Sequence, residues 1–216
     1  PAGMLIRQQN RLGRGLKRSG DVLFALAVLA CGSPVFITLA VLVKLSSPGP
    51  VFYVQRRVGR GYRRFGCIKF RTMRPNADRL LARVLEKDPD LRAEYERDFK
   101  LRRDPRITWI GNWLRRSSLD ELPQFLNVLR GEMSVVGPRP IVDKEVQRYG
   151  PYMDEVASVR PGLTGLWQVS GRNNLSYKKR VKLDLAYARG RTFSLDLAII
   201  LRTFGVLLLP MDRGAY

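Results

Sequence analysis

The chain has 216 residues, carries a formal net charge of +20 and contains no histidine. The length suffices for one domain with a hydrophobic core, and the charge indicates an anionic partner, either nucleic acid, anionic lipid or a phosphorylated substrate. The absence of histidine excludes a Ser-His-Asp triad, a histidine general base and a histidine-ligated metal. Any acid–base or nucleophilic role therefore falls on Asp, Glu, Lys, Tyr, Cys or Ser.

A run without charged residues extends over residues 22–43, with basic residues on both sides of it. As one straight helix it would be about 33 Å long, at ~1.5 Å per residue, which is enough to cross a bilayer core. Pro34 removes a backbone donor near the midpoint, so we expect a break there, with Ser33 bonding a carbonyl that Pro34 frees. Lys17, Arg18 and Lys44 favour the cytoplasmic side for both ends. The residues alone leave a re-entrant helix and a kinked single crossing equally open.

The next stretch, residues 50–73, has the pattern of a β-hairpin. Residues 51–54 are strand-like, residues 59–61 form a Gly-rich turn, and residues 67–73 alternate. A period of two puts Lys69 and Arg71 on one face, where two neighbouring cations suit a phosphate. A solvated strand face is the simpler interpretation of the same pattern.

The rest of the chain is expected to be mostly helical, which places the protein in the α+β class. Cys31 and Cys67 are expected to be unpaired residues of the core. The apolar-rich helix at residues 194–209 is expected either in a membrane interface or in the core. The predicted segments are a charged helical region at 76–100 broken near Pro89, helices at 141–160, a Gly-rich loop at 162–172 and a basic amphipathic helix at 176–190.

The densest group of polar residues surrounds Asp120 and Glu121. Ser118 precedes them and an apolar-periodic run follows, which predicts a helix N-terminus with Ser118 and Glu121 spaced as a capping box. In that interpretation the two acids cap a helix and do no chemistry. Arg115 lies just before them and Arg139 follows later, and carboxylates among arginines are expected to stay ionised, as a nucleophile or a Mg²⁺ ligand must.

The sequence resembles the bacterial sugar transferase family, the monotopic phosphoglycosyl transferases. The resemblance covers nearly all of the chain from about residue 17 onward, and the stretch FKLRRDPRIT (99–108) together with the closing RGAY is most similar to the galactose-1-phosphate transferase branch. It implies that the extra N-terminal membrane region and soluble domain of the largest members are not part of this chain. The matching motifs are KFRTM (69–73), DPRIT (104–108), RRSSLDELPQFLNVLRGEMSVVGPRP (115–140) and RPGLTGLWQVSGR (160–172).

The resemblance implies a role for each candidate residue. Asp120 would attack the β-phosphate of a UDP-sugar, release UMP and carry the phosphosugar until undecaprenyl phosphate takes it. Glu121 would help to hold Mg²⁺ together with Asp120, or would orient the pair. Ser33 and Pro34 would break a re-entrant membrane helix. The residues implied in substrate binding are Arg115 and Arg139, with weaker support for Lys69, Arg71, Pro138, Pro140 and Gln168.

The resemblance also implies an organisation and a location. Residues 1–48 would form a basic segment and the re-entrant helix, and residues 49–216 a catalytic domain with interfacial helices. The protein would lie in the bacterial inner membrane, in contact with anionic lipids and with the catalytic domain facing the cytoplasm. The resemblance is also compatible with a homodimer. The pathway implied is the first membrane step of glycan assembly, such as O-antigen, capsule or exopolysaccharide.

Three alternatives accompany this interpretation. A nucleic-acid-binding protein would explain the charge but not the uncharged run, and no recognition motif is present, so we expect no nucleic-acid partner. A non-catalytic, basic, membrane-anchored lipid-binding protein would leave the Asp-Glu pair among arginines without a purpose. Within the enzyme interpretation, galactose is the expected sugar, with glucose and N-acetylated sugars behind it.

Overall fold

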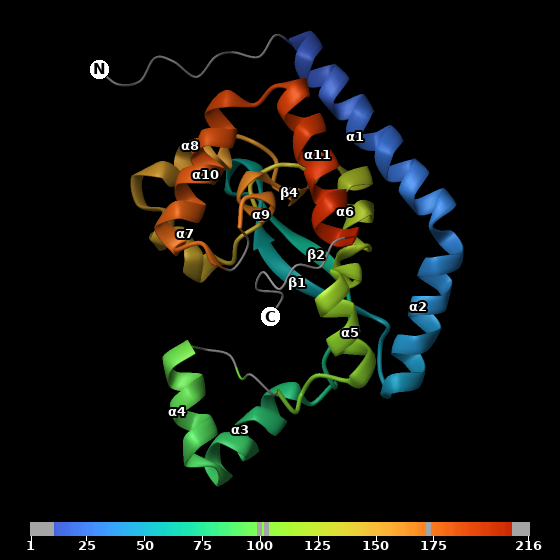
Figure 1. Ribbon diagram of the computed structural model, residues 1–216, viewed down its shortest axis with the longest axis vertical. Coiled ribbons are helices and arrows are strands. Elements are labelled where there is room, and N and C mark those ends of the chain that lie inside the picture. The colour runs from blue at the N-terminus through green and yellow to red at the C-terminus, as the bar shows by residue number, and fades with distance from the viewer. Residues whose placement is uncertain (1–10, 99–100, 102–103, 172–173, 209–216) are drawn as a thin grey trace. The chain divides into compact units, whose positions relative to one another are not determined.

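The computed structural model describes residues 11–98, 101, 104–171 and 174–208. This part of the chain is mostly helical, with two small two-stranded sheets (Figure 1). The α+β class expected from the sequence is therefore confirmed. Two motif segments lie partly or wholly outside the described residues, namely the stretch before DPRIT and the closing RGAY, and so does Arg172. The chain divides into two compact units, and each is described by itself below.

The helices and strands largely match the predicted segments. The charged region is broken before Pro89 as expected. The hairpin is present, with a first strand that is longer than expected and a second strand that begins three residues earlier than expected. One expectation is wrong, because the stretch 162–172 holds a strand and a short helix where a loop was predicted. In chain order the elements are α1 (Arg11–Cys31), α2 (Ser33–Ser46), β1 (Phe52–Val58), β2 (Arg64–Phe70), α3 (Ala77–Lys87), α4 (Pro89–Asp98), α5 (Trp109–Ser117), α6 (Gln124–Arg130), β3 (Ser134–Val136), α7 (Asp143–Tyr149), α8 (Met153–Ala157), β4 (Gly162–Thr164), α9 (Leu166–Val169), α10 (Tyr177–Gly190) and α11 (Phe193–Leu208).

The uncharged run is broken where the sequence predicted. α1 ends at Cys31, α2 begins at Ser33, and the two form a bent pair with an angle of 65° between them. Because Pro34 has no N–H, the carbonyl of Ala30 loses its helical donor, and the Ser33 hydroxyl donates to that carbonyl at 2.9 Å. Among the described residues no single helix is long and apolar enough to cross a membrane, whereas this bent pair is so by length and composition.

The first unit comprises residues up to 33, residues 54–68 and residues from 123 to 215. Its small sheet joins β3 and β4 in parallel, with Ser134 opposite Gly162 and Val136 opposite Thr164. The approach after β3 is so close that a Cβ on Gly137 would lie 2.5 Å from the Arg160 carbonyl oxygen, which only glycine avoids. Its hydrophobic core gathers residues from the hairpin, α7, α8 and α10, namely Val58, Ile141, Tyr149, Met153, Val156, Ala157, Val181 and Leu185.

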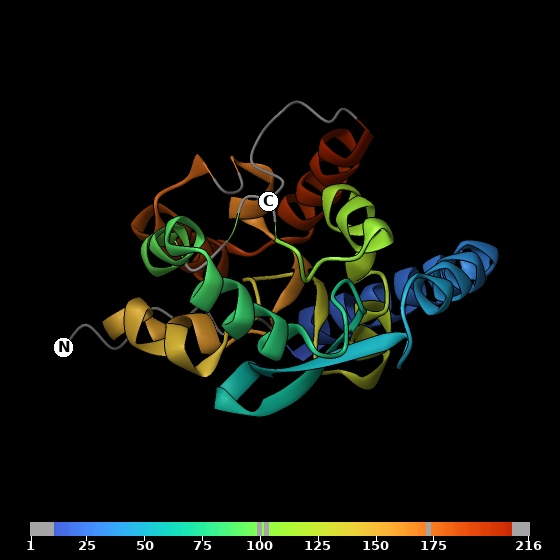
Figure 2. The ribbon, with the colours of Figure 1, turned by 90° about the horizontal axis from the view of Figure 1, so that it is seen from below.

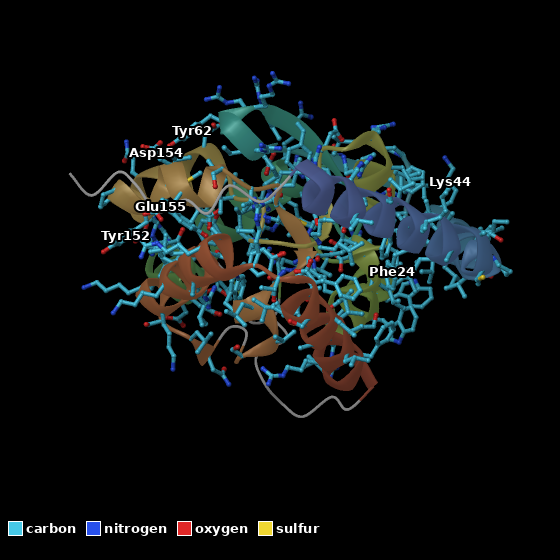
Figure 3. The ribbon with its side chains drawn as sticks, turned by 90° about the horizontal axis from the view of Figure 1, so that it is seen from above. Phe24, Lys44, Tyr62, Tyr152, Asp154 and Glu155 are labelled. Carbon is cyan, nitrogen blue, oxygen red and sulfur yellow. The ribbon has the colours of Figure 1, made fainter. Side chains whose placement is uncertain are left out.

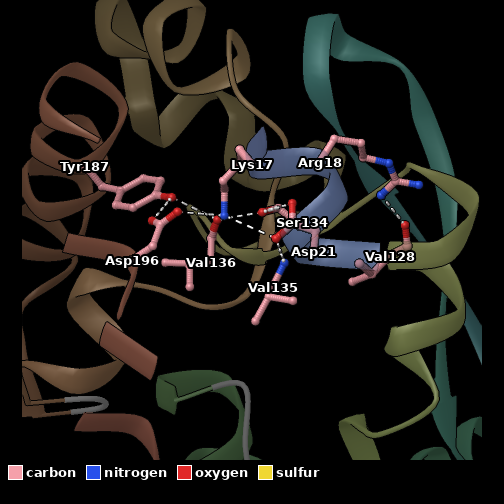
Figure 4. A network of polar contacts seen from close by, with 9 residues as sticks. All are labelled: Lys17, Arg18, Asp21, Val128, Ser134, Val135, Val136, Tyr187 and Asp196. Atoms are coloured by element: carbon pink, nitrogen blue, oxygen red, sulfur yellow. Dashed lines mark hydrogen bonds and ion pairs between the residues drawn. The ribbon is translucent and has the colours of Figure 1, made fainter. Parts of the chain in front are cut away.

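A polar network ties α1 to this sheet and to α11 (Figure 4). The buried Asp21 accepts hydrogen bonds from the Ser134 hydroxyl at 2.8 Å and the Val135 amide at 3.1 Å. Lys17 lies between two carboxylates, 3.2 Å from that of Asp21 and 2.8 Å from that of Asp196. The sequence indicated Lys17 only as a basic flank of the apolar run. In the fold it also neutralises two acids that would otherwise be desolvated without a counter-charge.

The hairpin formed by β1 and β2 is fixed in the first unit at its tip and along one edge. Figure 2 shows the two strands side by side. Tyr62, in the tip, donates its hydroxyl proton to Asp154 of α8 at 2.5 Å (Figure 3). Along the edge, Val58 pairs with Ile141, and Arg57 donates to the Pro140 carbonyl at 2.9 Å. The Pro138–Pro140 segment is thereby held between the hairpin and β4.

The second unit comprises residues 34–53 and 69–122, with residue 216. Its core packs α2 against the end of β2 and against α5, through Leu39, Val43, Phe70, Ile110 and Leu114. Phe70 stacks on Phe52 at 5.5 Å between ring centroids and lies 5.9 Å from Phe36. The KFRTM and DPRIT motifs run side by side here, because Met73 pairs with Ile107 and the Thr108 amide donates to the Thr72 carbonyl.

Candidate active site

The Asp-Glu pair lies in a short connection of the second unit. α5 ends at Ser117. The next residue, Ser118, takes a left-handed conformation at φ 59°, and Leu119–Glu121 form a single 3-10 turn. The amide of Ser118 bonds the carbonyls of Leu114 and Arg115, which closes α5 in the manner usual for a left-handed C-terminal residue. The predicted capping box is wrong, because the Ser118 side chain makes no capping hydrogen bond. Both acids therefore belong to a tight turn rather than to a helix N-terminus.

The two neighbouring carboxylates have different surroundings. Glu121 forms an ion pair with Lys69, whose ammonium lies 2.5 Å from the carboxylate. For Asp120 the structure records no ion pair and no side-chain partner within the described ranges. Lys69, which the sequence suggested only as a substrate-binding residue, thus lies beside the acid pair with Glu121 as its partner. This difference leaves Asp120 as the carboxylate that is available to a substrate.

The pKa of Asp120 is raised to about 6. Burial is the largest cause, and the negative charge of Glu121 adds to it, while Lys69 and Arg115 act in the opposite direction without cancelling the rise. The sequence-based expectation was only that the arginines would keep the carboxylate ionised, and it did not include the effect of burial. At neutral pH the carboxylate of Asp120 is still mostly deprotonated, yet it is more basic than an exposed aspartate.

Arg115 lies one turn before the acid pair, at the end of α5. Its Nε donates to the Thr72 hydroxyl at 2.9 Å, so the guanidinium is fixed through one nitrogen. The pKa of Arg115 is lowered from its usual value. Desolvation is the largest cause, and the charges of Asp120 and Asp104 act in the opposite direction. The two terminal nitrogens have no recorded hydrogen-bond partner among the described residues. Their N–H groups can therefore donate a pair of hydrogen bonds to two oxygens of a phosphate.

Arg71 has a different environment from the one predicted. Its side chain is buried and donates to backbone carbonyls at the end of α2, to Ser47 at 2.7 Å, Pro48 at 2.8 Å and Val43 at 3.4 Å. A phosphate contact would require these bonds to be released. In this arrangement Arg71 caps α2, and its predicted place in substrate binding gains no support.

The remaining predicted residues lie together in the first unit. Arg139 is within cation–π range of the buried Trp167, with 5.9 Å between the guanidinium carbon and the ring centroid. Gln168 donates to the Leu163 carbonyl at 3.0 Å, and its buried side-chain oxygen has no hydrogen-bond partner among the residues that the structure describes. Pro138 accepts a bond from the Gly162 amide, and Pro140 accepts the one from Arg57. Their predicted contacts with substrate stay predictions.

The acid pair is compatible with Mg²⁺. Magnesium in phosphate-transferring sites is usually held by one or two carboxylates, with water and substrate phosphates completing the shell. Asp120 and Glu121 supply two carboxylates whose mutual repulsion raises the pKa of Asp120, and a divalent cation would relieve that repulsion. The described residues contain no cluster of three or more His, Cys, Asp or Glu side chains that could hold a metal ion by themselves.

Comparison with known protein families matches most of the chain. The bacterial sugar transferase family matches residues 12–210. The chain belongs to the bacterial sugar transferase family. This membership agrees with the resemblance seen in the KFRTM, DPRIT and SLDELPQ motifs, all of which contribute residues to the second unit.

Three relatives illustrate the range of the family. The undecaprenyl-phosphate galactose phosphotransferase of Salmonella typhimurium is 47% identical over 217 residues, which are 99% of this chain and 45% of that protein. The exopolysaccharide production protein ExoY of Sinorhizobium fredii is 46% identical over 200 residues, 93% of this chain and 88% of that protein. The UDP-glucose:undecaprenyl-phosphate glucose-1-phosphate transferase of Escherichia coli K12 is 38% identical over 200 residues, 89% of this chain and 40% of that protein. The chain thus spans less than half of two of these relatives and most of the third.

Proposed function

We propose that this protein transfers galactose-1-phosphate from UDP-galactose to undecaprenyl phosphate and releases UMP. The observation that carries the proposal is the difference between the two neighbouring acids. Glu121 is held by Lys69, whereas Asp120 has no ion-pair partner in the part of the chain that the structure describes. The raised pKa of Asp120 gives a basic carboxylate that is still ionised at neutral pH. Such a group serves as a nucleophile without a general base, which suits a chain that has no histidine.

The reaction proceeds in two phosphoryl transfers. A carboxylate oxygen of Asp120 attacks the β-phosphorus of the UDP-sugar, the bond from that phosphorus to the bridging oxygen breaks, and UMP leaves with the electron pair. An oxygen of undecaprenyl phosphate then attacks the same phosphorus and displaces the Asp120 carboxylate. Both nucleophiles are anions, so neither step needs a base to remove a proton.

Two cations of the second unit have distinct tasks in this scheme. Arg115 presents its terminal nitrogens to the phosphate oxygens, where charge accumulates during transfer. Lys69 holds Glu121 and lowers the pKa of Asp120. When bound by Asp120, Glu121 and the substrate phosphates, Mg²⁺ would add charge neutralisation at the diphosphate. Arg139, Pro138, Pro140 and Gln168 remain predicted contacts on the strength of the resemblance.

Apolar surfaces that the fold leaves exposed support a membrane location. On the bent pair these include Leu23 of α1 and Ile37 and Leu45 of α2, at 65–77% exposed. On α11 one face carries exposed Phe193, Leu197, Leu201 and Phe204, at spacings typical of a helix stripe, which favours the interfacial position over the core for that face. We place the bent pair as a re-entrant segment and the catalytic residues on the cytoplasmic side, near anionic lipids.

The choice of galactose rests on the sugars in the names of the relatives. Those named for galactose include one at 47% identity, whereas the glucose-named protein of Escherichia coli is at 38%. The purified protein in lipid nanodiscs, given Mg²⁺ and undecaprenyl phosphate, should release UMP fastest with UDP-galactose among UDP-galactose, UDP-glucose, UDP-N-acetylglucosamine and UDP-N-acetylgalactosamine. Faster UMP release with another UDP-sugar would show that the proposed sugar is wrong and would leave the proposed reaction in place. No UMP release with any of the four UDP-sugars would overturn the proposed reaction.

A further inference from the structure

Thr72 lies next to Arg115 without belonging to the acid pair. The two residues are 43 positions apart in the sequence, and the Thr72 hydroxyl accepts the Nε–H of Arg115 at 2.9 Å. Thr72 is buried, with 8% of its surface exposed, so this hydroxyl is held in one place. A guanidinium that is tied through Nε keeps its two terminal nitrogens on the opposite edge, side by side.

The backbone of Thr72 is itself fixed by the beginning of α5. Its carbonyl accepts the Thr108 amide at 3.0 Å, and Thr108 in turn caps α5 by accepting from the Gly111 amide. Gly111 touches the same carbonyl so closely that a Cβ there would lie 2.1 Å from its oxygen. Residues 108, 111 and 115 are spaced by three and four and so share one face of the helix. This face of α5 therefore contacts Thr72 along its length, from Thr108 to Arg115.

The acid pair begins three residues after α5 ends. Because α5 is anchored on Thr72 at its start and through Arg115 at its end, the direction of the Arg115 guanidinium is set by Thr72 rather than by the acids. Asp120 follows Arg115 by five residues and belongs to the turn Leu119–Glu121, which packs against α5. The guanidinium edge that Thr72 leaves open is therefore the one that is available to a substrate phosphate at Asp120.

We propose that Thr72 is a positioning residue for the phosphoryl transfer, which aims the paired donors of Arg115 by holding its Nε. The inference rests on the proposed function in that Arg115 must grip a substrate phosphate. Thr72 itself touches no substrate. Its task requires the hydroxyl acceptor, which serine retains and valine lacks at nearly the same volume.

The test combines Thr72→Ser, Thr72→Val, Arg115→Ala and the double variant Thr72→Val/Arg115→Ala in the full chain in nanodiscs. The readout is kcat/KM for UMP release with UDP-galactose, Mg²⁺ and undecaprenyl phosphate. Thr72→Val should lower kcat/KM about tenfold, as expected when one hydrogen bond to a charged group is lost, and Thr72→Ser should stay within about threefold of wild type. In the Arg115→Ala background the valine substitution should change kcat/KM by less than about twofold, because the group that it positions is gone.

Two results would overturn the inference: wild-type activity in Thr72→Val, or an equal loss from the valine substitution with and without Arg115. The second result would mean that Thr72 acts through general packing. Thermal unfolding of each variant is measured alongside, and if Thr72→Val does not fold, Thr72→Ala takes its place under the same criteria. An Arg115→Ala variant with wild-type activity would instead contradict the proposed role of Arg115, and an inactive wild-type protein would contradict the proposed function.

Discussion

Asp120 and Glu121 are chemically alike and adjacent in the sequence, and their neighbours make them different. The ammonium of Lys69 lies at hydrogen-bonding distance from Glu121, so the charge of Glu121 is balanced. Asp120 is half-buried and lies next to the negative charge of Glu121. Burial and this charge together raise the pKa of Asp120 to about 6. A nucleophile benefits from such basicity as long as it is ionised at the working pH. The pair thus divides into an available carboxylate and a held one.

This account predicts opposite shifts of the Asp120 pKa in two single variants. Glu121→Gln removes a negative neighbour, so it should lower the pKa of Asp120 below about 6. Lys69→Met removes a positive neighbour, so it should raise the pKa of the same carboxylate. NMR titration of ¹³C-labelled aspartate in metal-free protein measures both directly, with Asp104, whose pKa is lowered beside Arg106, as the internal reference. Shifts of the same sign in the two variants would contradict this assignment of neighbours.

At the scale of elements, the end of α2 and the start of the KFRTM stretch act as one piece. Arg71 bonds three carbonyls of residues 43–48, and Lys44 donates to the Gly49 carbonyl at 3.1 Å. Gly49 has a φ of +113°, and a Cβ there would meet the Arg71 guanidinium at 2.3 Å. The connection is therefore built around the Arg71 side chain, and Phe70 beside it packs on α2.

We predict that Arg71→Met lowers stability and spares substrate affinity. Methionine fills part of the volume but leaves buried carbonyls without donors, which costs about 1–3 kcal/mol. The melting temperature of the variant should fall by several degrees. The KM for UDP-galactose should stay within about twofold of wild type, because the substrate does not touch Arg71 or the carbonyls that it binds. Arg115→Ala is the matched control, with the opposite pattern of altered kinetics and preserved stability. A large rise of KM in Arg71→Met would restore the role in phosphate binding that the sequence suggested.

The elements that were predicted correctly are those whose signals are local. Pro34 breaks a helix by removing its own N–H, and Ser33 satisfies the carbonyl of Ala30 three residues away, so both follow from neighbours in the sequence. The strand at Gly162–Thr164, in contrast, depends on its pairing with Ser134–Val136, almost thirty residues away. The pattern S-x-x-E is typical of a capping box, but Glu121 is instead paired with Lys69, 52 residues away.

The same distinction explains the site. Asp120, Glu121 and Arg115 were predicted from a motif and from family resemblance, and the second unit brings them together. Thr72 was missed because a threonine in a strand-like stretch carries no signal of its own, and its role depends on a bond across 43 positions. Arg71 was assigned to phosphate because a period of two puts it beside Lys69, although three carbonyls of another element bind it.

At the scale of the whole molecule, the account places both ends of the bent pair on the cytoplasmic side. Single cysteines introduced near Lys17 and near Lys44, in a chain with Cys31 and Cys67 replaced, should both be blocked by a thiol reagent only after the inner face is made accessible. Pro34→Ala restores a donor at the break and should straighten the pair toward a crossing, with one position then labelled from outside. Outside labelling of one position in the unaltered pair would show a single crossing instead.

The central claim is that Asp120 carries the phosphosugar, and trapping that species tests it most directly. The protein is mixed with UDP-galactose and Mg²⁺ without any polyprenyl phosphate, and UMP release and the mass of the peptide containing Asp120 are both measured. The account predicts UMP at no more than one equivalent per protein, a hexose-phosphate adduct on that peptide, and loss of both in Asp120→Asn. If UMP appears only when undecaprenyl phosphate is present and no adduct forms, the covalent route is wrong and Asp120 is a Mg²⁺ ligand in a direct transfer.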